Sequence, residues 1–131
     1  MIRNLLPGII WAIIILILSG MPGNYVPAIG NLMDWLNPDK VVHIILYAVF
    51  VGLSLFGLKR HYREEPLKKH HYYVILGIGI AFGGITEVLQ DHVFIGRDGN
   101  FFDFYADIFG CLIGLIVYLV YQRKKTVKVR R

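Results

Sequence analysis

The sequence is poor in charged residues and in cysteine. Only 18% of its 131 residues are Asp, Glu, Lys or Arg, against about 25% in ordinary soluble domains. The single cysteine, Cys111, excludes an intrachain disulfide and with it a small disulfide-built secreted fold. Hydrophobic residues make up 56% of the chain and the mean hydropathy is +0.55, which leaves more apolar surface than a soluble domain of this length can bury. These values exclude a soluble enzyme and a disordered segment.

Four long apolar runs are present instead, each close to the roughly 20 residues needed to cross a bilayer. They cover about residues 5–21, 41–58, 72–89 and 102–121. The runs lack the strict alternation of membrane strands, and without water only helices satisfy the backbone. The sequence therefore predicts an all-α fold, a four-helix transmembrane bundle, as a single membrane domain over residues 1–131.

The first run has features of a signal peptide, and the loop after it contains a short helical pattern. Arg3 followed by an apolar stretch resembles a secretory signal peptide, but the run is long and Met21-Pro22 is a poor cleavage site. We therefore expect an uncleaved helix. The following loop is rich in proline and glycine, yet residues 29–36 place apolar side chains at helical spacing, which predicts a short interfacial helix anchored by Trp35.

The distribution of charge predicts the orientation of the bundle. If the runs alternate in direction, the amino end, the 59–71 loop and the carboxyl tail lie on one side and hold 12 of the 14 Lys and Arg residues. Seven of the nine acidic residues fall on the opposite side. By the positive-inside rule, both termini are cytoplasmic. The basic isoelectric point of about 9.4 then indicates contact of the basic loop and tail with anionic lipids, and no nucleic-acid partner.

Polar residues in or beside the runs form a second pattern, which the predicted topology places at one outer level of the membrane. Asp39, His43 and Tyr47 are spaced i, i+4, i+8 and share one helix face. A charge that faces lipid costs about 2.5–3.5 kcal/mol, so Glu87 and Asp107 are expected to face the bundle interior. The candidate ligand-binding residues are Asp39, Lys40, His43, Tyr47, Glu87, Gln90, Arg97, Asp103 and Asp107.

The order of these residues resembles the VanZ-like family, which is named after a protein linked to low-level teicoplanin resistance. The resemblance covers about residues 38–114, and its matching positions are Asp39, Lys40, His43, Tyr47, Glu87, Gln90, Arg97, Asp103 and Gly110. The family usually has asparagine where this chain has Asp107. The resemblance implies a small four-span protein of the cell envelope and a contribution to glycopeptide resistance, but no particular reaction.

Three functions remain open from the sequence. The first is an outward pocket that binds or shields an amphiphile, such as a lipid head group, a lipid-linked cell-wall intermediate or a lipoglycopeptide, with Lys40 and Arg97 as cationic donors. The second is an enzyme that modifies a phosphorylated lipid head group, with Glu87 or His43 as general acid or base. The third is a structural subunit of a membrane assembly, and the oligomeric state stays open.

The sequence predicts neither a cofactor nor a metal. Potential metal ligands exist in His43, Glu87, Asp103 and Asp107, but they follow no recognised ligand spacing. The sequence also shows no nucleophile signature. The expected partner of the polar residues is a membrane lipid or a lipid-linked amphiphile.

Overall fold

The computed structural model describes residues 2–21, 38–62, 65–94 and 101–129. Four α-helices make up this part of the chain: α1 (Ile2–Ser19), α2 (Pro38–Tyr62), α3 (Lys69–His92) and α4 (Phe101–Val129). Each is long and apolar enough to cross a membrane. The chain is a four-span integral membrane protein, and the predicted all-α, four-helix architecture is confirmed.

The helices extend beyond the apolar runs into charged sequence. α2 continues four residues past Leu58, and α4 continues eight residues past Tyr121. The apolar runs mark only the part that lies in hydrocarbon, whereas Lys, Arg and Gln are good helix formers that carry a helix into the polar layer. α1 ends at Ser19, two residues earlier than predicted, where the N–H of Gly20 donates to the carbonyl of Leu16 at 3.0 Å. The predicted interfacial helix at 29–36, with Trp35, lies outside the described residues.

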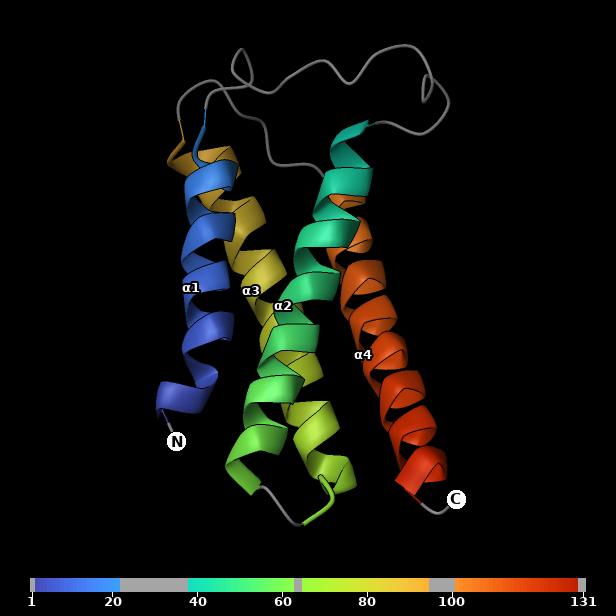
Figure 1. Cartoon of the computed structure of the whole chain (residues 1–131). Helices are drawn as coiled ribbons and strands as arrows, with labels where there is room; N and C mark the ends of the chain where they lie inside the picture. The colour runs from blue at the N-terminus through green and yellow to red at the C-terminus, as the bar shows by residue number, and fades with distance from the viewer. Residues whose placement is uncertain (1, 22–37, 63–64, 95–100, 130–131) are drawn as a thin grey trace.

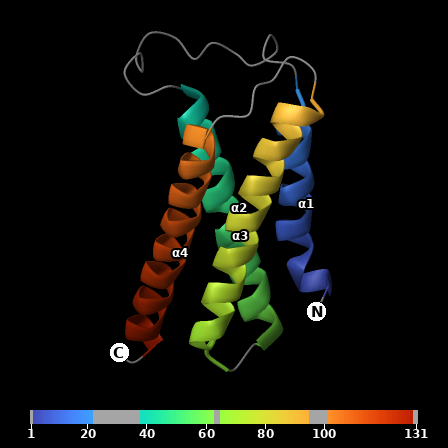
Figure 2. The same cartoon turned by 180° about the vertical axis from the view of Figure 1, so that it is seen from behind.

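α2 lies at the centre of the bundle. It packs most extensively on α4 and also contacts α1 and α3, and α3 contacts α4 (Figure 1). The view from behind shows α3 in front of α2 (Figure 2). The start of α1, the end of α4 and the connection between α2 and α3 lie at the same end of the bundle (Figures 1 and 2). This arrangement is the one that an even number of alternating spans produces.

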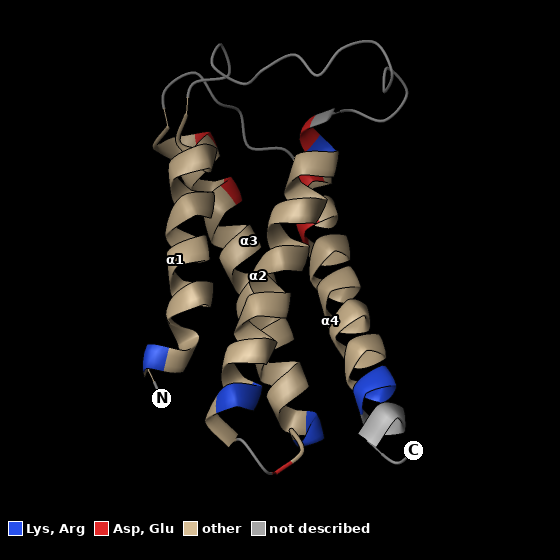
Figure 3. Ribbon diagram, viewed as in Figure 1, with Lys and Arg blue, Asp and Glu red and all other residues tan. Residues whose placement is uncertain are grey.

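Basic and acidic residues gather mostly at opposite ends of the bundle (Figure 3). The end with the start of α1 and the end of α4, called the basic end, carries the cations Arg3, Lys59, Arg60, Lys68, Lys69, Arg123, Lys124 and Lys125. The opposite end, called the acidic end, carries Asp39, Glu87, Asp91, Asp103 and Asp107. Among the described residues, Lys40 is the one Lys or Arg at the acidic end.

Glycines allow α2 and α4 to approach backbone to backbone. A Cβ atom at Gly110 would lie 2.5 Å from the carbonyl oxygen of Ile44, and one at Gly114 would overlap the carbonyl oxygen of Ala48. Small residues at four-residue spacing allow such contact between membrane helices. Of the small residues at 106, 110 and 114, Gly110 and Gly114 therefore form the close contact with α2.

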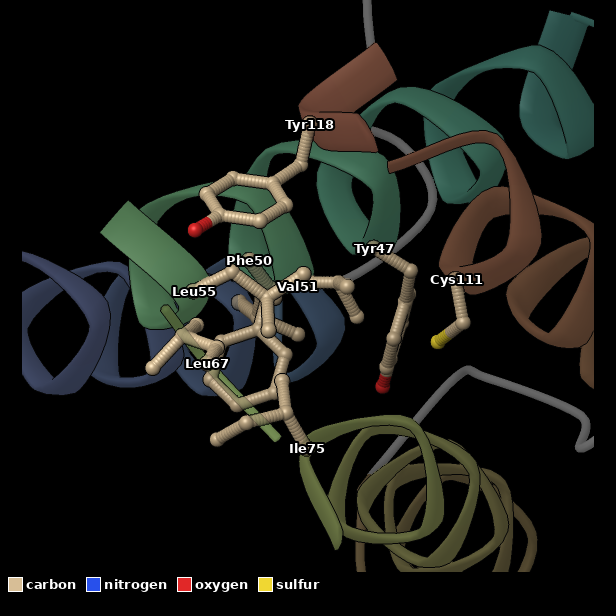
Figure 4. Packing of buried hydrophobic residues seen from close by; sticks show 9 residues of the cluster. Tyr47, Phe50, Val51, Leu55, Leu67, Ile75, Cys111 and Tyr118 are labelled. Atoms are coloured by element: carbon tan, nitrogen blue, oxygen red, sulfur yellow. The ribbon is translucent and has the colours of Figure 1, made fainter. Parts of the chain in front are cut away.

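The apolar core fills the space between the helices below the acidic end (Figure 4). Tyr47 from α2 and Cys111 from α4 both extend toward α3, and the sulfur of Cys111 packs against Gly79. Trp11 joins α1 to α2 by donating from Nε1 to the carbonyl of Leu46 at 2.9 Å. The core is continuous with the polar residues above it, because Tyr47 belongs to both.

Candidate functional site

Buried polar side chains gather at the acidic end, where α2, α3 and α4 meet. The predicted stripe on α2 is present, and it faces polar residues of the other two helices. The buried polar residues in this region are His43, Thr86, Glu87, Gln90, Asp103 and Asp107. We call these six, together with Asp39, Lys40 and Tyr47, the polar cluster. It brings together eight of the nine predicted site residues; the ninth, Arg97, lies outside the described residues.

The outermost layer of the polar cluster is an ion pair between α2 and α4. Lys40 Nζ donates to Asp103 Oδ1 at 2.9 Å, and the Asp103 side chain is only 7% exposed. The Lys40 ammonium also lies 5.7 Å from the centroid of the Phe102 ring. The sequence predicts Lys40 as a cationic donor to a ligand. In the structure, its partner is Asp103 of α4.

The middle layer joins all three helices through His43. Its Nδ1 lies 2.8 Å from Asp107 Oδ1 on α4 and 3.9 Å from Glu87 Oε1 on α3. An ionised aspartate only accepts hydrogen bonds, so with Asp107 ionised the shorter contact has its proton on Nδ1 of His43. Asp107 is fully buried, and within the described part of the chain its second oxygen, Oδ2, has no hydrogen-bond partner. This layer is the interior-facing acid pair that the lipid-exposure argument predicts.

The innermost layer is a chain of hydroxyl hydrogen bonds. Thr86 Oγ1 donates to the carbonyl of Gly83 at 2.8 Å, and the Tyr47 hydroxyl lies 2.7 Å from Thr86 Oγ1. Since Thr86 has one hydroxyl proton, the Tyr47 hydroxyl is the donor to Thr86. Thr86 is not among the residues predicted for the site. Its position directly before Glu87 is the sequence signal that links it to the site.

Gln90 forms a hydrogen bond with the end of α1. Its Nε2 donates to the carbonyl of Ser19 at 3.3 Å, and its side chain is buried. The last carbonyls of a helix lack partners within that helix. Gln90 therefore satisfies the end of α1 and joins α3 to α1.

A groove between α3 and α4 leads from the polar cluster to the outer surface of the bundle. Its volume is about 290 Å³, and its lining residues are Gly84, Glu87, Val88, Asp91, His92, Phe101 and Phe104. Val88 and Phe101 are 59% and 78% exposed on its rim. Apolar side chains exposed on a membrane bundle face acyl chains. Glu87 belongs to both the groove and the polar cluster, so the groove connects the lipid-facing surface with one carboxylate of the cluster.

Two overlapping sets of side chains have the geometry to hold a metal ion. His43, Glu87 and Asp107 form a fully buried set, and Asp39, His43 and Asp103 form a second set in which Asp39 is half-buried; in each set the ligand atoms lie within 4.8 Å of one another. The sequence indicates four of these residues as potential ligands but predicts no metal, because they follow no recognised spacing. The members of each set come from different helices, up to 64 residues apart, so no local spacing reveals the sets.

Comparisons with known proteins find no matching protein family, no similar curated protein and no similar solved structure. The fold defines the class of the chain, a four-span integral membrane protein with a polar cluster at one end of the bundle. The polar cluster and the groove are the features of this class member that point to a function.

Proposed function

We propose that this chain is a VanZ-like membrane protein whose polar cluster binds the head group of an amphiphile that enters from the lipid through the α3–α4 groove. The observation that carries the proposal is the position of Glu87. Its carboxylate lines the groove and also lies 3.9 Å from His43 in the buried cluster. An acyl chain in the apolar groove would hold a head group against these polar residues.

The chemistry of the groove favours a head group with hydrogen-bond donors. Among the described lining residues, Glu87 and Asp91 contribute carboxylates, and none is Lys or Arg. Lys40, the cation expected to bind phosphate, is paired with Asp103. Carboxylates accept from hydroxyl and ammonium groups. Lipid-linked cell-wall intermediates and lipoglycopeptides carry such donors, and binding or shielding of one of them would explain a contribution to glycopeptide resistance.

The orientation that suits this function places the basic end in the cytoplasm of a bacterial cell, with the polar cluster in the outer leaflet of the cytoplasmic membrane. The distribution of Lys and Arg supports it by the positive-inside rule (Figure 3). An amphiphile of the outer leaflet would then meet the groove directly.

The basic end is proposed to bind an anionic lipid. A cavity of about 530 Å³ there is lined by Arg3, Asn4, Phe56, Lys59, Arg60, Tyr121, Gln122 and Lys125. Four of these residues are cations, and the described lining contains no acid. Basic pockets between membrane helices suit anionic head groups. Two aromatic side chains in the same cavity would contact the acyl chains.

Photolabelling tests the amphiphile proposal. A phosphatidylethanolamine with a photoreactive group in its acyl chain carries the expected ammonium donor. In Val88→Trp the larger side chain would fill the groove. We therefore expect labelling at the acidic end to fall about tenfold, which corresponds to a loss of about 1.4 kcal/mol in binding free energy. Val74→Trp is the matched control, because Val74 is a similarly exposed valine of α3 at the other end.

Labelling that is equal in the unmodified chain, Val88→Trp and Val74→Trp would contradict the proposal. Labelling that is absent from the unmodified chain would favour the third function, a structural subunit. Elution as a single species in detergent would establish that each variant is folded.

The pair of His43 and Asp107 supports a second candidate function, an enzyme that modifies a phosphorylated lipid head group. A carboxylate 2.8 Å from an imidazole nitrogen orients the ring as in many general bases. Glu87 would serve as the acid on the groove side. Release of phosphate from a lipid-linked phosphate by the unmodified chain, and its loss in Glu87→Gln, would favour this candidate over simple binding.

A further inference from the structure

We infer that His43, Glu87 and Asp107 form a binding site for a divalent transition-metal ion such as Zn²⁺ or Mn²⁺. The inference concerns the buried layer of the polar cluster and stands whether or not the groove holds an amphiphile. Its first support is geometric. One nitrogen and two carboxylate oxygens, supplied by α2, α3 and α4, lie within 4.8 Å of one another.

A divalent cation would balance the charges of this layer. Glu87 is 9% exposed and Asp107 is not exposed, so two carboxylates lie in the apolar interior of a membrane bundle. Buried charges in such a medium are paired or coordinate metals. Two carboxylates with a neutral imidazole and one divalent ion sum to zero. Lys40, the described cation nearest along α2, is paired with Asp103 in the layer above.

The second oxygen of Asp107 provides independent support. Oδ2 is buried and, among the described residues, has no hydrogen-bond partner, although Oδ1 of the same carboxylate contacts His43. Buried polar atoms are almost always satisfied, and an exception indicates an absent water, ion or ligand. A metal ion at the carboxylate would account for it.

The choice between the two candidate sets also follows from the contacts. In the set of Asp39, His43 and Asp103, the Asp103 carboxylate already accepts from the Lys40 ammonium, which competes with a metal ion. Asp107 carries no such cationic partner from Lys or Arg among the described residues. A nitrogen and two oxygens suit zinc and manganese better than calcium, which prefers six to eight oxygen ligands.

Equilibrium dialysis against Zn²⁺ and against Mn²⁺, followed by elemental analysis, tests the site. The protein is the full chain in detergent after treatment with a chelator. His70→Ala and His71→Ala are introduced together in every sample, because these neighbouring rings outside the polar cluster, with centroids 4.0 Å apart, would bind zinc adventitiously. We expect about one ion per chain, and affinity about tenfold or more lower in Asp107→Asn and in Glu87→Gln. Each of these substitutions removes one metal-binding carboxylate and keeps the shape of the side chain.

Glu65→Gln is the matched control, since Glu65 is an exposed carboxylate between α2 and α3, outside the set and the groove. It should bind the ion as its parent, the chain with His70→Ala and His71→Ala alone, does, and the bound ion should raise the unfolding temperature of both by more than that of Asp107→Asn. No bound ion in the parent would overturn the inference and leave a shared proton as the balance of charge. Equal binding by all variants would also overturn it, because that result identifies an adventitious site only.

Discussion

Gly110→Ala and Gly114→Ala should each lower the free energy of unfolding by about 1–3 kcal/mol, the usual cost of overpacking a well-packed contact. The added Cβ would lie 2.5 Å from the Ile44 carbonyl oxygen in the first variant and would overlap the Ala48 carbonyl oxygen in the second. Both neighbours are backbone atoms of α2, so no side chain can rotate to make room. The two helices would have to separate along their main contact. Unfolding in mixed detergent micelles measures the loss.

Gly52→Ala and Gly77→Ala are the controls for this prediction. A Cβ at either position meets nothing within 4 Å, although both glycines lie inside helices. Alanine is the better helix former by about 1 kcal/mol, so these variants should be neutral or more stable. Equal destabilisation by all four substitutions would contradict the packing of α2 on α4 and would indicate a general sensitivity to side-chain volume.

Asp107→Leu should lower the free energy of unfolding by about 3–5 kcal/mol, the cost of breaking a buried pair by removing one partner. His43 is 4% exposed and would lose the carboxylate that lies 2.8 Å from Nδ1. Asp107→Asn should cost much less, since the amide oxygen can accept the same hydrogen bond.

The double variant His43→Leu/Asp107→Leu completes this test. Replacing both partners of a buried polar pair by apolar side chains is often nearly neutral. We therefore expect the double variant to recover most of the stability lost in Asp107→Leu. If the double variant is as unstable as the sum of the single variants, His43 and Asp107 do not act as a pair. The same unfolding measurement in mixed micelles decides the outcome.

The sequence predicts the helices and the level of the polar cluster well because both depend on composition and spacing along one element. Four apolar runs are enough to define four spans, and the spacing of Asp39, His43 and Tyr47 is enough to align them on one face. The ends of the helices are less predictable, because a helix continues into polar sequence without any change in backbone geometry. α4 shows this by continuing to Val129.

The pairing of side chains between helices could not be predicted from the sequence. It depends on how each helix is rotated about its axis, and the close contacts at Gly110 and Gly114 constrain this rotation for α2 and α4. The rotation of α2 and α4 brings Lys40 to Asp103, and that of α3 brings Thr86 to Tyr47. Gln90 lies at the predicted depth, but its rotation toward α1 gives it Ser19 as a partner.

Native mass spectrometry of the chain released from mild detergent tests the central claim most directly, because it detects whether the polar cluster holds an amphiphile. Glu87→Gln removes the charge that the groove and the cluster share, and Glu65→Gln makes the same change on an exposed residue between α2 and α3. The account predicts one bound amphiphile on the unmodified chain and on Glu65→Gln, and its loss from a folded Glu87→Gln. An unmodified chain without a bound amphiphile, or one that Glu87→Gln retains unchanged, would contradict it.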